Sequence, residues 1–236
     1  LARRTFNKFT TLSQEVMGAV QEGQSKQDPK LMMDGLEKAM KTFESGLDLA
    51  KEQFLIAELV HAQMGALAYQ GASLQLQLKL QQDMQRNKTA GLRLQKKADQ
   101  YFAEAKHHLE NAHSKNWTMT LIRQWQGVGM LSAMEYRDGK KDIAIERLAN
   151  CKSVGSSDPL YWQVYSWMMH ENNQASDAML AANEGLAKNE GNAGLVYLAD
   201  AIANQKSIDT CEFGMMWYSI FPEQLTMETA MRMQSQ

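Results

Sequence analysis

The feature that most constrains this 236-residue chain is a similarity between two of its own segments, which lie 34 residues apart. Gly139-Lys-Lys-Asp-Ile-Ala144-Ile aligns with Asn173-Gln-Ala-Ser-Asp-Ala178-Met, and this alignment pairs Ala144 with Ala178. Repeats of this length are supersecondary units that bury their apolar side against a neighbouring unit. We therefore expect the chain to stack similar units side by side.

Composition indicates that these units are helical. The sequence holds 3 prolines and 8% aromatic residues, and it is rich in Leu, Ala, Gln, Lys, Glu and Met, which favour helices over strands. The formal net charge of -2 lacks the basic surplus with which a nucleic-acid binder displaces phosphate counterions, so nucleic acid is not an expected partner. The sequence has no run of about eighteen apolar residues, so no transmembrane segment is predicted in it.

The repeat resembles the tetratricopeptide repeat (TPR), in which W-x2-L-G-x2-Y, A-x3-F and P follow one another within one repeat. Trp162-x2-Tyr165-Ser166 and then Ala178 follow this pattern, and Ala39-x3-Phe43-x2-Gly46 is the best match to the family's second helix. The resemblance is divergent, because only Trp162 occupies the signature tryptophan position and the upstream matches do not keep the spacing. It implies an all-α fold, a right-handed array of antiparallel helical hairpins (a TPR-like solenoid). Another all-helical fold is the alternative.

The resemblance also predicts a single helical-repeat domain over residues 1–236. It would begin with a helix at 5–22 and end with a cap at 207–236. Repeat-like units are expected between them at about 30–50, 51–113, 117–152, 159–188 and 192–205, with a helical insertion at 72–88 inside the second unit.

The segment at 72–88 alternates leucine with polar residues, at Leu74, Leu76, Leu78 and Leu80. A period of two formally indicates a half-buried strand, but the segment lacks β-branched and aromatic residues and is rich in helix formers. We therefore expect a helix with apolar stripes on two opposite sides. Such a helix either lies buried between two layers of its own domain or forms an oligomer contact with another copy of the chain.

Each TPR unit is a hairpin of a first helix, A, and a second helix, B. The resemblance implies a site for a partner, because the inner wall that the A helices form in TPR proteins binds peptides or helices. Carried over by position, the partner-binding residues here are Gln126, Tyr136, Arg137, Gln163, Trp167 and His170. The Lys, Arg and Asn clamp of some family members is missing, so the wall would be aromatic and weakly polar. The alternative is that Tyr136 and Trp167 simply pack within the array.

The sequence shows no motif for catalysis or metal binding. The two cysteines, Cys151 and Cys211, form neither a disulfide framework nor a zinc-ligand cluster. Glu104 and His108 are four residues apart and are expected to form a solvated surface pair, and His61 is expected to be a core or half-buried histidine. Because no phosphate-binding loop or H-E-x-x-H helix occurs either, we predict no metal, no cofactor and no catalytic residue.

The C-terminal region is methionine-rich and aromatic, with Met215-Met216-Trp217-Tyr218 shortly before Pro222. The last unit of a helical array has no following neighbour to cover it. A closing helix from Pro222 is expected to fold over that face and cap it. Alternatively, the face stays open for a partner helix.

These features favour a non-catalytic adaptor or assembly factor that holds another protein or peptide segment. The alternative is a ligand-binding accessory protein of a transport or cell-envelope system, and a helical enzyme is a third possibility. The sequence starts at Leu1 rather than at a methionine, so a signal or anchor that preceded it is compatible with it. Both a cytoplasmic and a periplasmic location fit two unpaired cysteines.

Overall fold

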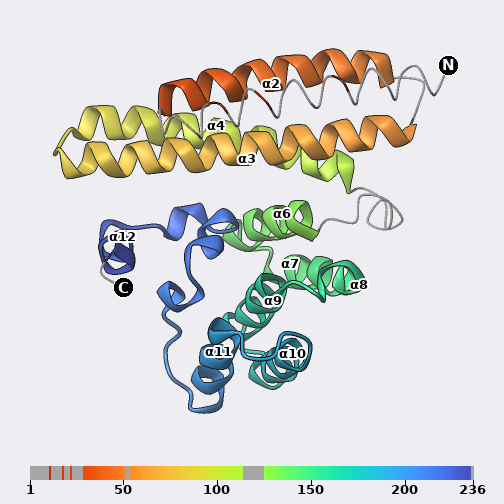
Figure 1. The fold of residues 1–236 in the computed structure, drawn as a ribbon, viewed down its shortest axis with the longest axis vertical. Coiled ribbons are helices and arrows are strands. Elements are labelled where there is room, and N and C mark those ends of the chain that lie inside the picture. Colours follow the sequence, from red (N-terminus) through yellow and green to blue (C-terminus); the bar gives the residue numbers. More distant parts are fainter. Residues whose placement is uncertain are drawn as a thin grey trace. The chain divides into compact units, whose positions relative to one another are not determined.

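The computed structural model describes residues 29–50, 54–113 and 125–234, together with Thr11, Gly18 and Glu22. Regular structure in these residues is helical, without a strand, which confirms the all-α prediction (Figure 1). Most of the helix predicted at 5–22 lies outside the described residues.

The chain divides into two compact units, residues 1–118 and residues 119–236, which we call the N-terminal and the C-terminal unit. Each unit has its own buried core. The chain was expected to form a single repeat domain over residues 1–236, and this expectation remains a prediction.

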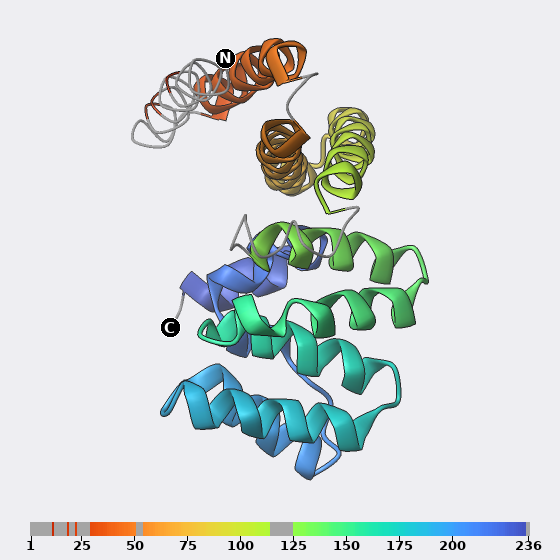
Figure 2. The ribbon, with the colours of Figure 1, turned by 90° about the vertical axis from the view of Figure 1, so that its right-hand side faces the viewer.

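The described residues of the N-terminal unit form three long helices, α2 (Pro29–Ala50), α3 (Phe54–Met84) and α4 (Lys88–Ala112). α3 and α4 form an antiparallel hairpin, and α2 packs against α3 (Figures 1 and 2). The core between α3 and α4 includes an edge-to-face pair of the Tyr69 and Phe102 rings, whose centroids are 5.2 Å apart. Such aromatic pairs add to the free energy gained from burying the rings.

The segment at 72–88 is helical, as expected, but it is not a separate insertion. It continues α3 through Met84 and then forms the turn into α4. The helix does not break at Gly71, where a Cβ atom would lie 3.1 Å from Cδ1 of Tyr101, so the glycine leaves room for that ring. Leu74 is buried, while Leu76, Leu78 and Leu80 are half-buried. Their contact with another copy stays a prediction.

The C-terminal unit contains shorter helices, several of which form hairpins. In order they are α6 (Trp125–Arg137), α7 (Lys141–Asn150), α8 (Lys152–Gly155), α9 (Pro159–Glu171), α10 (Ala175–Lys188), α11 (Ala193–Ala203), the 3-10 helices η1 (Thr210–Phe213), η2 (Met215–Ser219) and η3 (Pro222–Gln224), and α12 (Met227–Gln234). α9 and α10 lie within the unit expected at 159–188, and α11 lies within the unit expected at 192–205. The start of the unit expected at 117–152 falls on residues outside the described ones.

The same helix-ending turn follows α6 and, 34 residues later, α9. Gly139 (φ 81°) and Asn173 (φ 61°) adopt the left-handed conformation that glycine and asparagine tolerate. Two backbone hydrogen bonds close each turn: Gly139 N–H to Tyr136 O and Lys140 N–H to Glu135 O after α6, and Asn173 N–H to His170 O and Gln174 N–H to Met169 O after α9. The similarity in sequence therefore corresponds to equivalent backbone geometry.

Replacing Ala144 or Ala178 with leucine is expected to lower the free energy of unfolding of the C-terminal unit by about 1–3 kcal/mol, because the larger side chain must enter a packed core. Both alanines are 0% exposed, one on α7 and one on α10. Urea denaturation measures the effect. Ala149→Leu and Ala187→Leu, at exposed positions on the same two helices, are controls with an expected change below about 0.5 kcal/mol. A cost at only one of the two buried alanines would contradict the equivalence of the two copies.

Candidate functional site in the C-terminal unit

A stretch without α-helix, residues 209–224, lies against one face of the C-terminal unit, and we call it the C-terminal segment. Its first 3-10 helix, η1, packs on α11, and η2 packs on α9 (Figure 1). It also reaches α6, because a Cβ atom on Gly129 would lie 3.5 Å from Cδ1 of Ile220. The face that holds the segment is thus formed by α6, α9 and α11, and we call it the A-helix face.

Aromatic rings contribute to this contact. The ring of Trp167, on α9, lies 5.3 Å from the Trp217 ring and 5.0 Å from the Phe221 ring, centroid to centroid. Trp217 and Phe221 stack on each other at 4.6 Å, and Phe213 lies 4.6 Å from Trp217. Trp217 is 0% exposed and Phe221 is 2% exposed. Large, fully buried rings in this arrangement carry much of the free energy that holds the segment.

Polar contacts fix the ends of the segment. The backbone N–H of Asp209 donates to the Tyr197 hydroxyl on α11 at 2.7 Å, and Arg232 of α12 donates to the Asp209 carboxylate at 2.6 Å. The indole N–H of Trp217 donates to Oε1 of Gln224 at 2.7 Å, so the buried indole has a hydrogen-bond partner. These contacts give the segment one defined position without an α-helix.

The C-terminal cap expected at residues 207–236 stays a prediction beside this arrangement. The expected closing helix from Pro222 is wrong, because Pro222 begins only the short 3-10 helix η3, and the α-helix α12 begins at Met227. The covering residues come from upstream of Pro222. They adopt 3-10 turns around Gly214, whose φ of 76° interrupts any continuous helix.

The residues expected to bind a partner divide into three groups. Tyr136 and Trp167 meet, with ring centroids 5.5 Å apart, on the A-helix face. Gln126 and Gln163 bind within the unit. Arg137 is exposed, and His170 is half-buried at the end of α9.

The two glutamines connect α6 to the start of α9 and α9 to the start of α11. Gln126 of α6 donates to the Asp158 carboxylate at 3.3 Å, and Gln163 of α9 donates to Oδ1 of Asn192 at 3.0 Å. Asp158 and Asn192 are the N-cap residues of α9 and α11. Because a cap side chain also accepts from the first turn of its own helix, these contacts set the spacing of the A helices.

Two polar atoms near the ends of α6 and α9 remain without a hydrogen-bond partner among the described residues. They are the Tyr136 hydroxyl and Nδ1 of His170, both buried. Burial raises the pKa of Tyr136 to about 12, with a further contribution from the Glu171 carboxylate, so the hydroxyl stays protonated near neutral pH. Burial of a polar atom without a partner is unfavourable, so a polar group that reached either atom would gain a hydrogen bond.

A histidine cluster in the N-terminal unit was not foreseen from sequence. The expectation of a solvated Glu104–His108 pair is wrong for the histidine, because His108 is buried and its Nδ1 lies 2.9 Å from Nδ1 of His61. The His107 ring lies 5.2 Å from that of His108. His61 is half-buried, as expected. The pairing joins α3 to α4 over a distance of 47 residues in sequence, which no local spacing reveals.

Acidification is expected to destabilise the N-terminal unit by about 2–3 kcal/mol between about pH 6.5 and about pH 4. Burial, with smaller contributions from His61 and His107, lowers the pKa of His108 to about 4. In this range the unfolded chain takes up a proton that the folded chain excludes, so stability is lost as the pH falls. Urea denaturation at about pH 7 and about pH 5 measures the change. His108→Gln should reduce the difference between the two, and an unchanged difference would contradict the account.

Comparisons with protein-family models, with curated proteins and with solved structures find no match to this chain. Among the described helices, none is long and apolar enough to cross a membrane. The part of the chain that the structure describes also holds no group of three or more His, Cys, Asp or Glu side chains placed to bind a metal ion.

Proposed function

We propose that this chain is a non-catalytic scaffold, an adaptor or assembly factor, whose A-helix face binds polypeptide segments. The observation that carries the proposal is the C-terminal segment. A stretch of the chain that is not an α-helix lies across α6, α9 and α11 and buries Trp217 and Phe221 there. A face that holds one such segment has the rings and the polar groups to hold another of similar chemistry.

The proposal includes a TPR-like arrangement of the helices from α6 to α11. The turn shared by α6 and α9, the fully buried alanines on α7 and α10, and the N-caps Asp158 and Asn192 all recur at an interval of 34 residues. Small residues at these helix contacts are what the resemblance implies. In such an array the A helices line the surface that receives a partner.

The contacts of the C-terminal segment indicate which side chains a partner would carry. It would carry two aromatic side chains four residues apart, as Trp217 and Phe221 are, to pack on Trp167. A polar group at one end would reach the Tyr136 hydroxyl and Nδ1 of His170, which have no partner within the described residues. Aromatic anchors supply most of the binding energy in many interfaces.

The test is exchange of the C-terminal segment in a chain that has already folded. Gln205 and Lys206 are exposed, so a protease site placed between them allows the linker to be cut after folding. A labelled peptide of residues 207–236 added in excess is expected to replace the released fragment, as measured by fluorescence anisotropy. The same peptide with Trp217→Ala and Phe221→Ala is the matched control and is expected not to bind.

The proposal fails if the cut fragment cannot be exchanged, or if its release unfolds α6, α9 and α11 as seen by circular dichroism. Either result would make the A-helix face part of the core. Selection of random peptides on the cut chain then identifies the partner's pattern. We expect the selected peptides to contain aromatic pairs four residues apart.

A further inference from the structure

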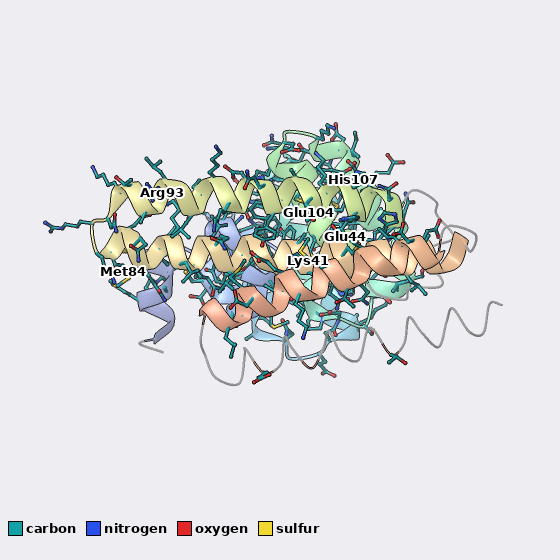
Figure 3. The ribbon with its side chains drawn as sticks, turned by 90° about the horizontal axis from the view of Figure 1, so that it is seen from above. Lys41, Glu44, Met84, Arg93, Glu104 and His107 are labelled. Carbon is teal, nitrogen blue, oxygen red and sulfur yellow. The ribbon has the colours of Figure 1, made fainter. Side chains whose placement is uncertain are left out.

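A cavity of about 250 Å³ opens in the N-terminal unit, where α2 and α4 flank α3. It is lined by Met33 and Glu37 of α2, Gln75 of α3, and Lys97, Gln100, Tyr101 and Glu104 of α4. Because α2 packs mainly against α3, the gap between α2 and α4 is left open above Gln75. Figure 3 views this side of the unit, with Glu104 labelled on α4 and Lys41 and Glu44 labelled on α2.

Gln75 brings an unsatisfied hydrogen-bond acceptor to this cavity. The residue is 3% exposed, and its Nε2 donates to the Met33 sulfur at 3.3 Å. Its Oε1 is buried and accepts no hydrogen bond from any of the described residues. A buried carbonyl oxygen without a donor is unfavourable, so a ligand that donates to it gains the hydrogen bond at little cost.

The other polar groups around the cavity are mainly acidic or neutral. Burial raises the pKa of Glu104, and the Glu44 carboxylate raises it further. Burial likewise raises the pKa of Tyr101, with contributions from the Glu37 and Glu104 carboxylates. The carboxylates of Glu37, Glu44 and Glu104 thus act on groups at the cavity, and His107 opposes their effect at Glu104. A cationic ligand would relieve the repulsion among these carboxylates.

We infer that the cavity binds a small organic cation with N–H donors, of the alkylammonium class, which donates to Gln75 Oε1 and pairs with the carboxylates of Glu37 and Glu104. The Tyr101 ring, which lies against Gly71, also lines the cavity. The volume lies below the range of drug-sized pockets, which suits a short amine. This site lies in the N-terminal unit and does not depend on the function proposed for the C-terminal unit.

Isothermal titration calorimetry of the full chain with putrescine tests the inference. Saturable binding of putrescine is expected, with no binding of butanol, the uncharged analogue, or of butyrate, the anion. Gln75→Leu and Glu104→Gln should each weaken binding by about tenfold or more, because the first removes the acceptor of the ligand's N–H group and the second removes a negative charge that pairs with it. Gln77→Leu and Glu110→Gln, exposed residues on the same helices, are the matched controls and should leave the affinity unchanged.

The positive charge of Lys97 opposes binding of a cation in this cavity, so its removal tests the sign of the charge that the cavity selects. Lys97 is the basic residue in the lining, so Lys97→Gln should strengthen putrescine binding several-fold. Absence of saturable putrescine binding, preference for butyrate, or weaker putrescine binding by the Lys97→Gln variant would each overturn the inference. Equal affinity for tetramethylammonium, which has no N–H donor, would do the same. If Gln75→Leu lowers the helix content, Glu104→Gln with an unchanged melting temperature decides the outcome.

Discussion

Trp217→Ala is expected to remove about 3–5 kcal/mol of the free energy that holds the C-terminal segment on the A-helix face. The indole is 0% exposed, contacts the rings of Trp167, Phe213 and Phe221, and donates to Gln224. Truncation leaves a cavity among these rings, and none of the remaining side chains can fill it without moving. The expected result is a lower melting temperature of the C-terminal unit and faster protease cleavage within residues 209–224.

Met216→Ala is the matched control for this substitution. Met216 precedes Trp217 in the same 3-10 helix and is 66% exposed, so its truncation removes little buried surface. Its effect should stay below about 0.5 kcal/mol. Equal effects of the two substitutions would show that burial of the indole does not hold the segment.

The second large effect is expected in the ion pair between Glu135 of α6 and Arg147 of α7. Arg147 donates from Nε to Oε2 at 2.8 Å and from Nη2 to Oε1 at 2.6 Å. The side chain of Glu135 is 6% exposed and that of Arg147 is 26% exposed. Arg147→Ala should lower the free energy of unfolding by about 3 kcal/mol, because it leaves a buried carboxylate without its guanidinium. Urea denaturation of the C-terminal unit measures this.

Two further variants separate the buried charge from the loss of contacts. Replacing Glu135 and Arg147 together with methionine should cost far less than Arg147→Ala, because no charge then remains buried. Lys206→Ala removes an exposed ion pair with Asp200, whose side chains are 60% and 55% exposed, and should cost less than about 1 kcal/mol. A double variant as unstable as Arg147→Ala would contradict the role of the buried charge.

Helix positions in the C-terminal unit could be predicted from sequence because local signals mark them. Asp158-Pro159 and Asn192 are N-cap signals, and Gly139 and Asn173 are residues that suit a helix-ending turn. Local signals conflict between Leu74 and Leu80, because the period of two indicates a strand whereas the helix formers indicate a helix. Helix propensity gave the correct answer there, but the continuity of α3 through Gly71 depends on the distant Tyr101 ring, which no local pattern contains.

The candidate site could be predicted only in part. The resemblance predicts that Tyr136 and Trp167 bind a partner, with packing inside the array as the alternative; their rings are in contact, and binding of a partner stays a prediction. It assigned Gln126 and Gln163 to a partner, whereas their hydrogen bonds reach N-caps that lie 32 and 29 residues away. Contacts over such distances arise from tertiary packing, as do the His61–His108 pair and the position of Trp217 on Trp167. A search of spacing within one helix cannot find them.

Native-state hydrogen exchange of the C-terminal unit tests most directly whether the C-terminal segment is an exchangeable occupant of the A-helix face. If it is, amides of residues 209–224 will exchange through a local opening, at a lower free energy and a smaller denaturant dependence than amides of α6 and α9. If the segment is instead an inseparable part of the core, all these amides will exchange together at the free energy of global unfolding, and the proposed binding face will be contradicted.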